Sequence, residues 1–164
     1  MFDGIHIRTK KEFKAVLDKY YDSDYRYLHI SCHGDDTSLS TTLDSISHEE
    51  FAELTEDYLY EKRLFLSACS ATNMHLAENV IPNSGCYSII GPSNDIEFND
   101  AAIIWAAFYH LIFKANPKAM KRADILPVLK KLVKTFGVAM NYFSTSSSRK
   151  SGVKGTIIKM KRAV

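Results

Sequence analysis

Short apolar runs alternate with segments of helical periodicity along this chain. Three runs, at residues 27–32, 63–68 and 86–90, are rich in Leu, Ile, Phe and Tyr and are bounded by polar or small residues. Apolar runs of this length are typical of parallel strands that are buried on both faces. Between them, apolar residues recur three and four positions apart, as on the buried face of a helix. The pattern therefore predicts an α/β fold with a mostly parallel central sheet and helices on both faces.

Capping signals mark where two of the helices should begin. Thr9 and Glu12 have the spacing of a capping box, and Ser47 and Glu50 have the same spacing. A last helix should begin at Asp124 and end near Gly137. A turn at residues 82–85 should end an earlier helix. Further elements are expected at residues 4–8 (a first strand, forming a β-α-β unit), 39–46 (a small hairpin outside the main sheet), 101–113 (an apolar helix), 138–143 (an edge strand) and 156–160 (a short strand).

Length and composition indicate one globular domain over residues 1–164. The chain has 164 residues, of which 46% are hydrophobic and 24% charged, which suffices for a core of ordinary size. Residues 145–164 are basic and rich in Ser, and we expect this C-terminal segment to be mobile. The formal net charge of +2 is too small to argue for nucleic acid. We therefore do not expect a nucleic acid as partner. No apolar run approaches the roughly 18 residues of a membrane span, so we do not expect a membrane as partner either.

The cysteine content suggests a reducing compartment. Three cysteines are an odd number and show no Cys-x-x-Cys or similar metal-ligand spacing. A disulfide framework is therefore not indicated, and we expect a cytoplasmic protein without a metal or other cofactor. The first residues contain no apolar segment of the kind found in secretory signals.

Two reactive side chains follow two of the predicted strands. His33 comes after the first apolar run and Cys69 after the second. In open α/β sheets, functional groups collect outside the carboxyl ends of the strands. If the two strands are parallel neighbours, His33 and Cys69 emerge side by side at that edge. A thiol beside an imidazole is the minimal nucleophile and base for acyl transfer.

The two strand ends, LHISCHG and LFLSACSAT, resemble the His and Cys strands of the caspase-like cysteine peptidases, and most of all the CHAT type. The resemblance covers residues 25–113 and implies a three-layer α/β/α fold with His33 and Cys69 as a catalytic dyad. It also implies that the backbone N–H groups of Gly34 and Cys69 bind the oxyanion. Gly34 suits this role because it has no Cβ to block the approach. The Gln-Ala-Cys-Arg-Gly signature of caspases proper is absent, so cleavage after Asp is not implied.

The helix expected after Cys69 would add stabilisation of negative charge through its N-terminus. The other two cysteines, Cys32 and Cys86, lie within apolar runs and are interpreted as core residues. Cys32 directly precedes His33 and should point to the opposite side of the strand. His75 follows Cys69 closely in sequence and is a weaker candidate for the site.

Specificity is predicted from the charges near the strand ends. Asp35 and Asp36 follow the His33 strand, and Asp95 and Glu97 follow the third strand, so all four are candidates for substrate binding. Arg63, at the start of the second run, lies at the opposite end of the sheet. These charges favour Lys or Arg before the scissile bond, as in gingipains, separases and metacaspases. A neutral pocket with an apolar preference is the alternative if all four acids face solvent.

The sequence therefore predicts a cysteine endopeptidase that cleaves protein or peptide substrates. The main alternative is a catalytically silent caspase-like adaptor or regulatory module, working with a protein partner in a signalling or defence assembly. An intact His-Cys pair argues against it, because silent copies tend to lose one of the two residues. A flavodoxin-like nucleotide or signalling domain is disfavoured, because no Gly-rich phosphate loop follows the first strand.

Overall fold

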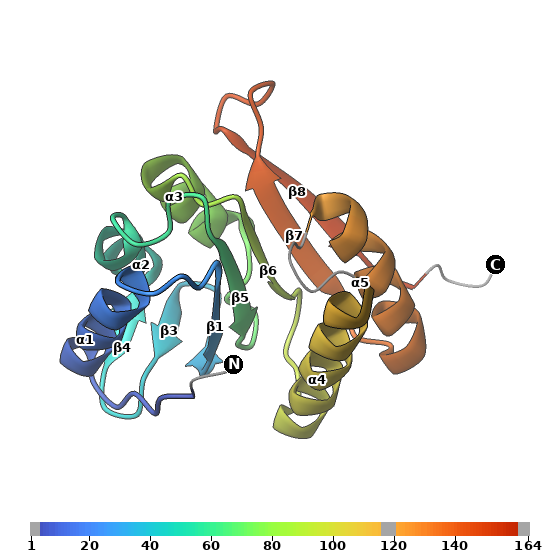
Figure 1. The fold of residues 1–164 in the computed structure, drawn as a ribbon, viewed down its shortest axis with the longest axis horizontal. Coiled ribbons are helices and arrows are strands. Elements are labelled where there is room, and N and C mark those ends of the chain that lie inside the picture. The colour runs from blue at the N-terminus through green and yellow to red at the C-terminus, as the bar shows by residue number, and fades with distance from the viewer. Residues whose placement is uncertain (1–3, 116–120, 161–164) are drawn as a thin grey trace.

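The computed structural model describes residues 4–115 and 121–160, which form five helices and two β-sheets. The central sheet has five strands in the order β1-β5-β6-β7-β8 (Figure 1). Its first three strands run parallel, and the last two pair antiparallel. This confirms the predicted α/β class and the mostly parallel sheet. The strands are β1 (Tyr27–Ser31), β5 (Arg63–Ser67), β6 (Ser88–Pro92), β7 (Met140–Thr145) and β8 (Val153–Ile158).

Helices cover both faces of this sheet, as predicted. Successive side chains of a strand point to opposite faces. Leu64 and Leu66 of β5 therefore pack into one core cluster, while Phe65 between them packs into the other. The first cluster is covered by α1 (Lys10–Tyr21), α2 (His48–Thr55) and α3 (Met74–Ser84), and the second by α4 (Phe98–Ala115) and α5 (Arg122–Phe136) (Figure 1). The result is a three-layer α/β/α arrangement.

The strands that precede His33 and Cys69 are parallel neighbours, but one of them is not central. β1 pairs only with β5 and lies at the edge of the sheet. The expected first strand at residues 4–8 is not formed, so the predicted β-α-β unit is wrong. The backbone of Arg8 is used elsewhere: its N–H donates to Glu12 at 2.7 Å, and its carbonyl accepts from Leu43 at 2.8 Å. These bonds tie the segment to the α1 cap and to the neighbouring hairpin rather than to β1.

A second, smaller sheet follows β1 directly. It consists of β2 (His33–Gly34), β3 (Ser38–Ser40) and β4 (Ser45–Ser47), paired antiparallel in that order. The hairpin expected outside the main sheet is confirmed. Because β2 begins two residues after β1 ends, the small sheet holds His33 just beyond the edge of the main sheet.

Two helices, α1 and α2, begin where the capping signals predicted. Thr9 and Glu12 form the predicted capping box of α1, and Ser47 accepts from the N–H of Glu50 at the start of α2. Asp124 does not begin α5. It lies inside the first turn, where its carboxylate accepts from the N–H of Lys121.

Two other helix boundaries lie outside their predicted ranges. The apolar helix extends beyond residues 101–113 at both ends, as α4. α3 continues past Pro82 to Ser84 and ends on Gly85, whose φ of 67° is the left-handed conformation that glycine adopts readily. None of the helices within residues 4–115 and 121–160 combines the length and apolar character that crossing a bilayer requires.

The C-terminal segment belongs largely to the sheet. β7 lies between β6 and β8, so it is not the edge strand that the sequence suggested. β8 pairs with β7 along its whole length, with Val153 opposite Thr145 and Ile158 opposite Met140. The prediction of a mobile segment over residues 145–164 is therefore wrong for β8, while residues 161–164 lie outside the described part of the chain. The composition of the C-terminal segment could not show that part of it pairs with β7.

Candidate active site

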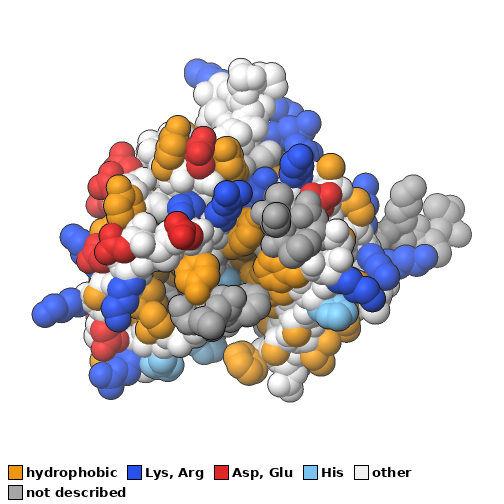
Figure 2. All heavy atoms as spheres, viewed as in Figure 1, with side chains coloured by type: hydrophobic (Ala, Val, Ile, Leu, Met, Phe, Trp, Pro, Cys, Tyr) orange, Lys and Arg blue, Asp and Glu red, His pale blue; other side chains and the backbone are white. Residues whose placement is uncertain are grey.

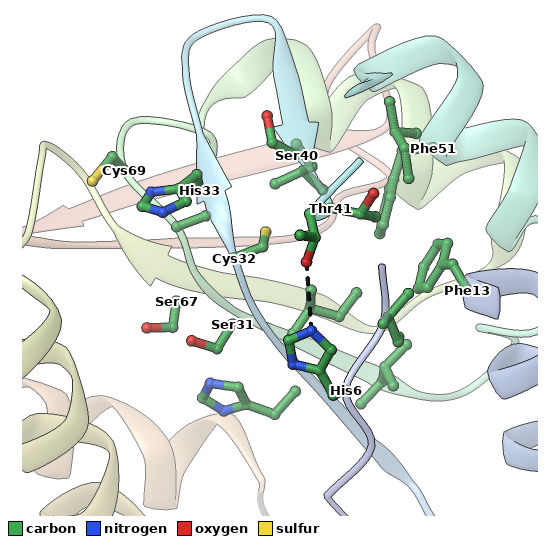
Figure 3. A pocket seen from close by; sticks show the side chains of 18 of the residues that line it. His6, Phe13, Ser31, Cys32, His33, Ser40, Thr41, Phe51, Ser67 and Cys69 are labelled. Carbon is green, nitrogen blue, oxygen red and sulfur yellow. Dashed lines mark hydrogen bonds between the residues drawn. The ribbon is translucent and has the colours of Figure 1, made fainter. Parts of the chain in front are cut away.

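His33 and Cys69 lie at one edge of the sheet, as the parallel pairing of β1 and β5 requires. Ser31 and Ser67, the last residues of these strands, are register partners, and the N–H of Cys32 donates to the carbonyl of Ser67 at 3.1 Å. The chain then carries His33 and Cys69 outward, and both line the same pocket. Figure 3 shows the imidazole of His33 beside the thiol of Cys69, with Cys32 on the other side of the strand, as predicted.

Cys69 occupies a tight turn with an unusual backbone. Ser70 has a φ of 50°, and the N–H of Ala71 donates to the carbonyl of Cys69 at 2.5 Å. A non-glycine residue in this region costs of order 1–3 kcal/mol and persists only where its surroundings hold it. Here the hydroxyl of Ser70 donates to Asp95 at 2.9 Å. The thiol of Cys69 lies 3.6 Å from the carbonyl oxygen of Ile96, so the loop after β6 holds both residues of the turn.

Two asparagines hold the rest of the turn. The Nδ2 group of Asn73 donates to the carbonyl of Ser70 at 3.1 Å and to that of Asp36, after β2, at 2.8 Å. Asn141 of β7 donates to the carbonyl of Thr72 at 2.7 Å. These contacts connect the Cys69 turn to both neighbouring parts of the fold. The position of the thiol is therefore set by residues far away in sequence.

The helix after Cys69 does not reach the thiol, contrary to expectation. α3 begins at Met74, and its N-terminal N–H groups are capped by the side chain of Asn73. Residues 70–73, which belong to the same turn as Cys69, separate the thiol from the helix. A helix N-terminus acts mainly within its first turn, so it offers little stabilisation to a thiolate at Cys69.

At Gly34 the backbone passes close to the Cys69 turn. A Cβ on Gly34 would lie 3.0 Å from the Cβ of Ala71 and 3.2 Å from that of Ala68. The N–H of Cys32 points toward β5 and the N–H of Asp35 toward β3. Because N–H directions alternate along a strand, the N–H of Gly34 points to the same side as that of Cys32, where Cys69 lies. This direction suits the oxyanion role that the resemblance implies.

His29 is a pocket residue that the sequence did not single out. It lines the pocket of His33 and Cys69, and its ring meets the ring of Trp105 edge-on with centroids 4.9 Å apart. Its Nδ1 lies 2.6 Å from the hydroxyl of Tyr109. Burial lowers the pKa of His29 to about 4, so the imidazole is neutral at pH 7. The hydrophobic pattern placed His29 within a strand but gave no sign of the aromatic cluster that α4 brings to it.

The surroundings of Cys32, Cys86 and His75 fit structural rather than catalytic roles. Cys86 is fully buried, and Cys32 packs against the core beside α1 while also lining the pocket. Burial raises the pKa of each of these thiols to about 11. His75 is not among the residues that line the pocket. Its ring lies 2.9 Å from Glu49 and 3.2 Å from His48, on the side of α2.

The four acidic candidates lie around the site rather than in its pocket. Asp35 accepts from the backbone N–H groups of Thr37 and Ser38, and these bonds, with those of the two hydroxyls, hold the pKa of its carboxyl below the usual range. Asp95 is bound by Ser70. The other two acids, Asp36 and Glu97, are exposed, and none of the four is among the pocket-lining residues. A role in substrate binding stays a prediction for all four.

The pocket has a volume of about 710 Å³ and runs around the end of β1. Among the described residues that line it, none is Asp, Glu, Lys or Arg, and most are aliphatic or aromatic. The described part of the chain also contains no group of three or more His, Cys, Asp or Glu side chains arranged to hold a metal ion.

Comparison with known families and proteins adds no further assignment. No family model matches the sequence, and a search of curated proteins finds no match either.

Proposed function

We propose that this protein is a cysteine peptidase in which His33 and Cys69 form the catalytic dyad. The observation that carries the proposal is their position: both side chains line one pocket at the carboxyl ends of two neighbouring parallel strands. The left-handed backbone at Ser70, held by Asp95, supports it, because such conformations gather at functional sites.

The proposed reaction has two steps. His33 takes the proton of the Cys69 thiol, and the sulfur attacks the carbonyl carbon of the scissile peptide bond. The N–H groups of Gly34 and Cys69 hold the resulting oxyanion, and His33 gives its proton to the departing amine as the C–N bond breaks. Water, deprotonated by His33, then attacks the thioester. The acid leaves and the thiol is restored.

The thiol must exchange its present contact for one with His33. Its sulfur lies 3.6 Å from the carbonyl oxygen of Ile96, and a thiol is only a weak hydrogen-bond donor. Breaking this contact therefore costs little. Catalytic hydrogen bonds are often loose before substrate binds and tighten in the substrate complex.

The same contact favours one alternative, a silent adaptor that binds a regulatory protein partner without cleaving it. In that case the Cys69 thiol would remain with Ile96, and His33 would not alter its reactivity. For either function we propose a reducing compartment such as the cytoplasm, because Cys32, Cys69 and Cys86 are all free thiols.

Cleavage of unfolded, fluorescently labelled casein by the full chain tests the proposal. We expect peptide release that falls at least about 100-fold in Cys69→Ala and in His33→Ala, because a positioned base typically contributes 10²–10⁴-fold. Matched controls are Cys86→Ala and His75→Ala, which change the same residue types outside the pocket. Release that persists in Cys69→Ala would overturn the proposal. So would its absence from the wild-type protein, which would leave the adaptor as the better account.

A further inference from the structure

The pocket has a distinct part directly beside the proposed dyad. Ser31 and Ser67 are register partners and lie on the same face of β1 and β5 as His29. Figure 3 shows the two serines next to each other, below His33 and Cys69, and all four line the pocket. The loop after β6 and the start of α4 line this part with Ile96, Phe98 and Ala101. A side chain on the residue whose carbonyl Cys69 attacks must lie within a few ångströms of this part.

This part of the pocket offers no counter-charge to a charged side chain. Its described lining contains no Asp, Glu, Lys or Arg, and His29 is neutral at pH 7. Asp95, bound by Ser70, and Asp35, bound by the turn that follows it, are exposed to solvent and are not among the lining residues. Moving an ammonium, guanidinium or carboxylate group out of water without a partner is strongly unfavourable, whereas an apolar side chain gains by burial.

We propose that the pocket selects an uncharged, apolar side chain of the size of Leu, Met or Phe in the residue before the scissile bond. The inference rests on the proposed peptidase function and names its substrate class. It departs from the preference for Lys or Arg that the acidic side chains suggested, because those four side chains are not among the residues that line the pocket. Phe98 is the residue through which we expect the preference to be changed most easily, since it lines the pocket and is 78% exposed.

A panel of fluorogenic tetrapeptides that differ only in the last residue tests this directly. With the full chain, we expect kcat/KM for Leu or Phe to exceed that for Lys, Arg and Asp by at least about tenfold. Turnover that depends on Cys69 but favours Lys, Arg or Asp would overturn the proposed apolar preference and leave the proposed peptidase function intact. No turnover of any peptide, or turnover that persists in Cys69→Ala, would overturn both.

A charge placed in the pocket provides the second arm. Phe98→Glu should lower the ratio of Leu to Lys turnover by about tenfold, because the new carboxylate can pair with a Lys side chain. The matched control is Ile103→Glu, which adds the same charge to the same helix at a position that is 55% exposed and outside the pocket lining. Ile103→Glu should leave the ratio unchanged. An equal change in both variants would show that long-range charge, rather than the pocket, sets the preference.

Discussion

At Gly34 the backbone passes so close to the Cys69 turn that a side chain has almost no room. The neighbours that a Cβ would meet are the Cβ atoms of Ala71 and Ala68 and the carbonyl oxygen of Ser38 at 3.2 Å. Two of these belong to the turn that holds the proposed nucleophile. Because Ala68 and Ala71 are also buried core residues, a change at this glycine acts both on the geometry of the site and on the core.

Gly34→Ala should lower kcat/KM at least tenfold, because the new methyl group must displace the turn by a few tenths of an ångström. Peptidase kinetics alongside thermal unfolding measure the two effects separately. The control is Gly4→Ala, where a Cβ would meet nothing within 4 Å, and neither activity nor stability should change. Wild-type activity in Gly34→Ala would show that this close approach is not needed for catalysis.

Protonation of a single residue, His29, makes the free energy of unfolding depend on pH. Burial lowers its pKa from 6.5 to about 4, so the unfolded chain binds the proton more readily than the folded one. The resulting stabilisation is complete above about pH 6.5 and is lost as pH falls toward 4, by on the order of 3 kcal/mol. His29→Gln should therefore lose stability less steeply over this range in urea unfolding, while His110→Gln, at an exposed position, should follow the wild type. An unchanged slope in His29→Gln would contradict the assignment.

At the scale of elements, the loops after the strands matter more than the strands themselves. β1 and β5 place His33 and Cys69 at one edge, but the turn that holds Cys69 is fixed by Asn73, Asn141 and Asp95. Asn73 has two functions, since it caps α3 and binds the turn. Replacing it removes both, whereas replacing an N-cap elsewhere removes only one.

Asn73→Ala and Thr9→Ala should each cost about 1 kcal/mol of unfolding free energy, because each removes a helix N-cap. Only Asn73→Ala should also lower kcat, by tenfold or more, because only Asn73 binds the carbonyls of Ser70 and Asp36. Urea unfolding and peptidase kinetics on both variants separate stability from positioning. Equal activity in the two would mean that Asn73 acts only as a helix cap.

At the scale of the whole molecule, the hydrophobic pattern predicted most of the fold. Runs of buried residues identified β1, β5 and β6, and capping boxes identified the starts of α1 and α2. The edge position of β1 was not predictable, because it depends on whether another segment pairs with that strand. Most of the lining of the pocket was not predictable for the same reason: residues 5–7, Ile96 and Phe98 reach the pocket through tertiary packing that no local pattern records.

The net charge does not reveal how unevenly the charges are distributed over the molecule. The value of +2 combines two unlike parts, since residues 101–164 contain 13 Lys and Arg but a single Asp. Figure 2 shows Lys and Arg prevailing over α5 and β8, and most Asp and Glu side chains over the part that holds α1 to α3. The described pocket lining contains no Asp, Glu, Lys or Arg, and neither the net charge nor the acids near the strand ends indicated this from the sequence.

Alkylation by iodoacetamide at pH 7 tests whether His33 activates Cys69, without any assumption about substrate. Cys32 and Cys86 are internal references, because burial raises the pKa of each thiol to about 11. Peptide mass spectrometry should find Cys69 alkylated at least about tenfold faster than either. In His33→Ala the Cys69 rate should fall at least tenfold, while His75→Ala should keep the wild-type rate. A Cys69 rate that is the same in wild type and His33→Ala would contradict the dyad.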